Sequence, residues 1–100
     1  MYIYMSNYVI LNECYKNAEK LELNIKTSKN INKKIDVYKN DKFLFSIGNI
    51  KYSDYNYYIK DYNLDYANKR RILYYKRNKM SEKDKLDNNT RKYISSKILW

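Results

Sequence analysis

The sequence predicts an α+β domain in which a small antiparallel sheet comes first and helices follow it. Two stretches, 21–26 and 33–47, alternate apolar with polar residues at the period of a β-strand. After residue 50 the apolar spacing becomes helical, and the whole chain of 100 residues contains no proline and only one glycine. We therefore expect a strand over 21–26, a hairpin over 33–47 and then two to three helices.

The hairpin is predicted by its two apolar faces and by the turn between them. The residues expected to share a face are Ile35 and Val37 in the first arm, and Phe43, Phe45 and Ile47 in the second. Asn40-Asp41 separates the arms and suits a tight turn, because asparagine tolerates positive φ. Gly48 is expected where a side chain would hinder the backbone.

The sequence allows two interpretations of the structure of the first fifteen residues. Residues 1–15 are either a short hydrophobic strand or an arm docked on the domain, and Glu13 to Lys20 reads as a helical turn or a loop. The apolar run lacks a basic flank and is too short to span a bilayer. We expect neither a signal peptide nor a transmembrane helix.

Helices are expected from residue 54 onward, with an exposed loop between the last two. Ser53 or Asp54 can cap the first helix, and Asn63 is expected to end it before Leu64 opens the second. Residues 81–89 read as a solvent-exposed loop. The tail 90–100 can be helical or extended, and its apolar end, Ile98-Leu99-Trp100, is expected to dock on the core.

Composition indicates a single small basic domain over residues 1–100 and argues against an enzyme. The net charge is +10, and residues 51–100 hold thirteen basic and six acidic groups against eight and five in residues 1–50. There is no histidine, and Cys14 is the only cysteine, so histidine-based catalysis and cysteine-based zinc sites are excluded. We expect no catalytic residue, no metal and no cofactor, and a reducing compartment.

Three carboxylates, Asp54, Asp61 and Asp65, are candidates for a divalent-metal site or for a pair of acid and base catalysts. Helix capping and salt bridges to a basic surface account for all of them more simply. The predicted role of these residues is therefore structural.

The predicted site is a cationic helix that begins near Leu64. Its six basic residues are Lys69, Arg70, Arg71, Lys76, Arg77 and Lys79. Three of the four arginines of the chain lie there, which suggests that the planar guanidinium is needed for a phosphate, a carboxylate or an aromatic face. The partner is either an external polyanion, DNA or RNA, or an acidic protein; pairing of these arginines with carboxylates of the chain itself is the internal alternative.

Tyrosines gather just before this helix. Their positions are Tyr52, Tyr55, Tyr57, Tyr58 and Tyr62. Tyrosines beside a basic helix are typical of single-strand nucleic-acid binders, but tyrosine at helical spacing is also typical of a core. Both interpretations stay open at this point.

Several motifs together resemble a family of short proteins of unknown function encoded by large DNA viruses of algae and protists. They span roughly residues 33–100 and comprise Phe43-Leu44-Phe45-Ser46-Ile47-Gly48, Tyr52-Ser53-Asp54-Tyr55, Tyr58-Ile59, Ala67, Arg70-Arg71, Tyr74, Lys76-Arg77 and Ile98-Leu99-Trp100. The chain departs from the family pattern at Asn78, where a histidine is usual, and at Asp87-Asn88-Asn89, where a glycine is usual. The resemblance implies a viral origin and no particular activity. We accordingly expect an accessory or virion-associated protein in the virion or host cytoplasm, not secreted, and the sequence does not give its oligomeric state.

Overall fold

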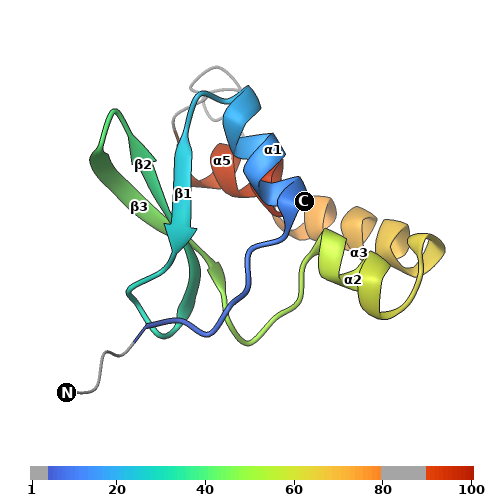
Figure 1. Cartoon of the computed structure of the whole chain (residues 1–100). Helices are drawn as coiled ribbons and strands as arrows, with labels where there is room; N and C mark the ends of the chain where they lie inside the picture. The colour runs from blue at the N-terminus through green and yellow to red at the C-terminus, as the bar shows by residue number, and fades with distance from the viewer. Residues whose placement is uncertain (1–4, 80–89) are drawn as a thin grey trace. The chain divides into compact units, whose positions relative to one another are not determined.

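The computed structural model describes residues 5–79 and 90–100. The chain divides into two compact units, Met1–Tyr52 and Ser53–Trp100. The first unit contains a sheet and one helix, and the second contains three described helices (Figure 1). The α+β class is confirmed. One domain over residues 1–100 stays a prediction, and the expected loop over 81–89 lies outside the described residues.

A three-stranded antiparallel sheet forms the centre of the first unit, in the order β1-β2-β3. Its strands are β1 (Asn24–Thr27), β2 (Lys33–Lys39) and β3 (Lys42–Asn49). Asn40 and Asp41 join β2 to β3 with φ of 51° and 64°. Two successive positive φ values match the right-handed twist of a hairpin, so the predicted tight turn is confirmed. Gly48 also has a positive φ, 80°.

A β-bulge changes which residues of β3 face the core. Val37 pairs with Phe45, but the next residue of β2, Tyr38, pairs with Phe43, so one residue of β3 is extra at this point. Directly paired residues share a face, and Phe43 therefore lies with Tyr38, at 5.7 Å between ring centroids, and is 55% exposed. The expectation that Phe43 shares a face with Phe45 and Ile47 is wrong because strict alternation ignores the extra residue.

Helix α1 (Asn12–Lys20) precedes the sheet. For this stretch the sequence predicts either a helical turn or a loop, and a helix is observed. It buries only Cys14 and Ala18, which are small side chains one turn apart. The helix ends in a Schellman motif, because Leu23 N donates to Ala18 O at 2.9 Å and Glu22, with φ 58°, occupies the left-handed position. This motif occupies the residues up to Leu23, so β1 starts at Asn24 and the strand predicted over 21–26 is shifted toward the C-terminus.

The described part of the N-terminal segment, residues 5–11, contains no strand. Ser6 N donates to Ser28 O at 2.9 Å, and Thr27 Oγ1 donates to Tyr8 O at 3.4 Å. The ammonium of Lys34 lies 5.4 Å from the centroid of the Tyr8 ring. These contacts attach the segment to the end of β1 and to β2 in the manner of a docked arm.

A buried carboxylate joins the three strands of this unit. Asp36, only 4% exposed, accepts hydrogen bonds from Ser28 Oγ at 2.6 Å, from Lys29 N at 3.0 Å and from the hydroxyl of Ser46. Burial raises the pKa of Asp36, but these hydrogen bonds and the charge of Lys29 outweigh it and hold that pKa below its usual value. The carboxylate is therefore ionised at neutral pH and satisfied by the loop between β1 and β2 and by β3.

The second unit contains three described helices, each with a side-chain cap at its start, and the predicted cap Asp54 is among them. The helices are α2 (Tyr55–Asp61), α3 (Leu64–Arg77) and α5 (Arg91–Ile98). Asp54, Asn63 and Thr90 accept a hydrogen bond from the backbone N–H three residues later, so each caps its helix. The sequence allows residues 90–100 to be helical or extended, and the helix α5 is observed there. None of the helices within the described ranges is long and apolar enough to cross a membrane.

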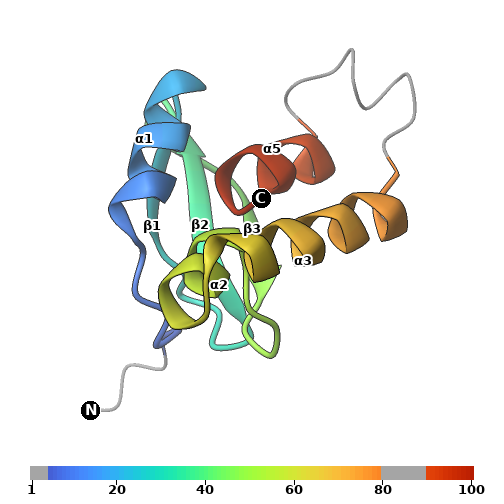
Figure 2. The same ribbon diagram turned by 90° about the vertical axis from the view of Figure 1, so that its right-hand side faces the viewer.

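The chain end returns to the start of α2. Leu99, 1% exposed, accepts a hydrogen bond from Tyr55 N at 3.2 Å, and Trp100 stacks on Tyr74 of α3 at 4.4 Å between ring centroids. Tyr75 of α3 reaches α5, where its hydroxyl donates to Ser96 O at 3.4 Å. Helix α5 thus runs beside α3, as Figure 2 also shows.

Candidate nucleic-acid interface

Helix α3 has one packed face and one exposed face. The packed face carries Ala67, Arg70, Arg71, Tyr74 and Tyr75, of which Ala67 is fully buried and the others are half-buried. These positions recur at three- and four-residue intervals, as expected for one side of a helix. The six basic residues predicted as the site are therefore divided between two environments.

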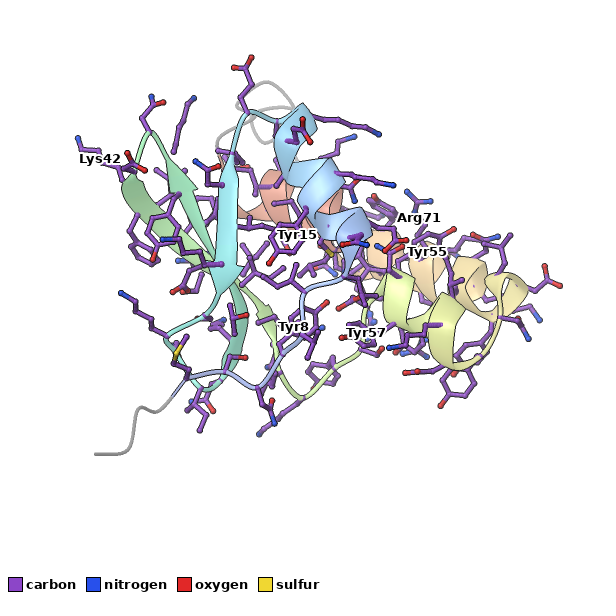
Figure 3. All side chains as sticks on the ribbon, in the orientation of Figure 1. Tyr8, Tyr15, Lys42, Tyr55, Tyr57 and Arg71 are labelled. Atoms are coloured by element: carbon purple, nitrogen blue, oxygen red, sulfur yellow. The ribbon has the colours of Figure 1, made fainter. Side chains whose placement is uncertain are left out.

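The two adjacent arginines are engaged inside the second unit. The guanidinium of Arg71 lies 4.5 Å from the centroid of the Tyr55 ring and 5.9 Å from that of Tyr75 (Figure 3). Arg70 lies 5.4 Å from the centroid of Tyr58, and its Nε is buried without a hydrogen-bond partner among the described residues. Cation–π contacts of this kind stabilise the packing of α2 on α3. The sequence favours an external partner for these arginines and gives pairing with internal carboxylates as the alternative; the observed contacts are internal, but they are with tyrosine rings.

The remaining basic residues are exposed and form what we call the cationic face: Lys69, Lys76, Arg77 and Lys79. Lys69 and Lys76 are seven residues apart, so they lie within about 20° around the helix and roughly 10 Å along it. Lys76 and Arg77 belong to the last helical turn, where cations interact favourably with the helix dipole. Within α3 itself, Asp65 in the first turn is followed by no further acidic residue, so the later turns of the helix carry only positive charges.

Three tyrosine rings of the second unit are in mutual contact, and the ring centroids of Tyr58 and Tyr62 are 6.3 Å apart. The ring centroids of Tyr58 and Tyr66 are 5.6 Å apart, and those of Tyr66 and Tyr62 are 4.6 Å apart with an interplanar angle of 35°. Exposure rises along the row to 38% for Tyr66 and 64% for Tyr62. We call these three residues the tyrosine row. The sequence grouped Tyr58 with Tyr62 but missed Tyr66, which belongs to the first turn of α3.

Tyr58, the least exposed of these three tyrosines, also belongs to a second, packed aromatic cluster. Tyr58 lies 6.1 Å from Trp100, which is stacked on Tyr74 with an interplanar angle of 8°. Burial raises the pKa of Tyr74, and the neighbouring Tyr75 raises it further against a hydrogen bond with Ser95. The phenol of Tyr74 is consequently neutral at physiological pH and serves in packing.

The carboxylates weighed as a possible acid/base or metal set do not come together. Asp54 is fully buried and caps α2 by accepting a hydrogen bond from Tyr57 N at 3.4 Å, whereas Asp61 and Asp65 are exposed. Over residues 5–79 and 90–100, no group of three or more His, Cys, Asp or Glu side chains is arranged to hold a metal ion. Capping is the observed role of Asp54.

No family model, curated protein or solved structure matches this chain. The resemblance to short viral proteins therefore stays a prediction. The fold and the surface define the chain as an α+β protein with an exposed cationic helix face beside a row of tyrosines.

Proposed function

We propose that this protein is a non-enzymatic binder of nucleic acid, and that it binds through the cationic face of α3. The observation that carries the proposal is that Lys69, Lys76, Arg77 and Lys79 are all exposed on or directly after one helix. Lysine and arginine side chains that neutralise phosphates release counterions from the nucleic acid, and this release favours binding independently of sequence. A net charge of +10 adds long-range attraction.

Arg70 and Arg71 have a supporting role in this proposal. Their guanidinium groups lie against tyrosine rings, so they hold α3 on α2 and keep the cationic face oriented. The binding set is accordingly smaller than the six residues expected from the sequence. It consists of the four exposed cations.

A second candidate function is docking on an acidic protein surface, as a minor structural protein of a virion. One observation favours it: Ile72 and Leu73, on the exposed side of α3, are 57% and 45% exposed. Apolar side chains between cations are typical of a protein interface, where they supply buried area. Capture of partners from virions or infected cells separates the two functions, because nuclease treatment releases the partners only if nucleic acid holds them.

Neutralising the cationic face is expected to weaken nucleic-acid binding more than the same loss of charge elsewhere. The test variant changes Lys69, Lys76 and Lys79 to Gln; the matched control changes three exposed lysines of the first unit, Lys20, Lys39 and Lys42, to Gln. Both lower the net charge equally. We expect the dissociation constant for random duplex, measured by fluorescence anisotropy, to rise about ten-fold or more in the test variant, because direct phosphate contacts are lost.

The control should show only the smaller effect of reduced long-range attraction. Equal weakening in both variants would mean that the helix is not the contact surface. Far-UV circular dichroism of both variants establishes that each is folded before binding is compared.

A further inference from the structure

We infer that the nucleic acid taken by this protein is single-stranded, and that one of its bases stacks on the exposed ring of Tyr62. The inference rests on the proposed function and names its substrate class. It combines two features of the second unit, the tyrosine row and the cationic face. The tyrosine row comes from α2, from its C-cap Tyr62 and from the first turn of α3, and the cationic face comes from α3 and from Lys79 directly after it.

The tyrosine row ends in an open position. Each of the three rings contacts the other two, and Tyr62 is 64% exposed although Tyr58 and Tyr66 are more buried. Exposing a large aromatic side chain forfeits the free energy of burying it. A planar base placed on the outer face of Tyr62 would add a fourth ring to these three and recover part of that free energy.

The phosphates of the same strand have cations within reach. Tyr66, the neighbour of Tyr62 in the row, is three residues before Lys69, which corresponds to about 5 Å along the helix. Lys76 follows roughly 10 Å further on, close to the same line around the helix. A base on Tyr62 therefore starts a path on which the backbone of the strand passes first Lys69 and then Lys76.

Stacking on a protein ring selects single strands over duplex. In a duplex the base faces are already stacked on one another, whereas an unpaired base offers its face to an aromatic side chain at no cost in base pairing. Such stacking tolerates any base, since every base has a π face. The cationic face alone would bind both forms, and the tyrosine row adds affinity only for the unpaired one.

The test compares binding of short oligothymidine with binding of an abasic strand of equal length, which carries the phosphates without bases. We expect Tyr62→Ala to weaken oligothymidine binding about ten-fold and to leave abasic-strand binding unchanged, as expected for the loss of one stacked base. Tyr62→Phe, which keeps a ring, should bind like the unsubstituted protein. Tyr62→Leu, which is apolar without a flat face, should behave like the alanine variant.

The matched control is Tyr52→Ala, because Tyr52 is 69% exposed and belongs to the first unit. It should leave binding to both strands unchanged. A melting curve shows whether Tyr62→Ala remains folded. If the alanine variant loses stability, the comparison of Tyr62→Phe with Tyr62→Leu still tests whether a base stacks on the ring. The protein should also prefer oligothymidine to the corresponding duplex at equal salt.

Two results would overturn the inference. If Tyr62→Ala and Tyr62→Leu bind oligothymidine normally while the lysine variant of α3 does not, nucleic-acid binding stands but stacking on Tyr62 does not occur. If the protein instead binds vesicles containing phosphatidylserine and no strand, and loses that binding on Ile72→Ser with Leu73→Ser, the exposed face is a lipid surface and the proposed function fails with the inference.

Discussion

Deleting Leu99 and Trp100 is expected to lower the free energy of unfolding of the second unit by about 4 kcal/mol. Leu99 is 1% exposed, and its carbonyl accepts the hydrogen bond from Tyr55 N. Trp100 is half-buried and stacks on Tyr74 at 4.4 Å. The deletion removes a buried aliphatic side chain, a stacked ring and an acceptor at the start of α2 together.

The measurement is a melting curve followed by circular dichroism, in which the midpoint should fall by about 10 °C or more. Trp100→Phe is the matched control, because it keeps a ring on Tyr74 and should cost much less than the deletion. An unchanged midpoint combined with lost binding would assign the chain end to a partner surface. In that case the packed cluster around Tyr58 and Tyr74 would not contribute to stability as described.

Replacing Asp36 by Ala is expected to lower the free energy of unfolding by about 3 kcal/mol at neutral pH. The carboxylate is 4% exposed and is the acceptor for Ser28, Ser46 and the backbone N–H of Lys29. Removing it leaves donors without their partner, and hydrogen bonds to a charged acceptor contribute more than neutral ones. Urea denaturation at pH 7 measures the change.

The contribution of Asp36 should also depend on pH in a definite direction. Its pKa is lowered in the folded protein, so the stabilisation is fully present above the unfolded pKa of about 3.9 and is lost as the pH falls through the lower folded value. The difference between the unsubstituted protein and Asp36→Asn should accordingly narrow below about pH 4. Glu19→Ala, which removes an exposed carboxylate of α1, should change stability by less than about 0.5 kcal/mol at any pH. If the difference in free energy of unfolding between the unsubstituted protein and Asp36→Asn does not vary with pH, the hydrogen bonds do not depend on an ionised Asp36.

The sequence predicted the strands and helices where side-chain period and cap chemistry agree. The hairpin is predictable because Asn40-Asp41 supplies the turn, and α3 because Asn63 marks the break before Leu64. The sequence alone does not distinguish helix from loop at α1, because the buried side chains, Cys14 and Ala18, are too small to give a strong apolar period. The β-bulge opposite Tyr38 could not be predicted, since one extra residue in β3 is not recognisable from the apolar and polar pattern of the sequence.

The site was predictable as a set of charges but not as a surface. The environment of Arg71 was not predictable from the sequence, because the nearest ring to its guanidinium, that of Tyr55, comes from another helix. Helical spacing alone places Arg70 near Ala67, on the packed face, and this signal could have suggested that it is not free to bind. The pairing of Tyr62 with Tyr66 depends on how the chain turns between α2 and α3, which no periodic pattern encodes.

A salt titration of binding to random single strands and duplex tests the central claim most directly. Because four cations are exposed on the cationic face, we expect the logarithm of the binding constant to fall with the logarithm of salt concentration with a slope of about −3 on single strands, and to depend little on base sequence. Absence of binding at low salt, or binding that does not change with salt, would contradict the proposal that α3 recognises the phosphates of a nucleic acid.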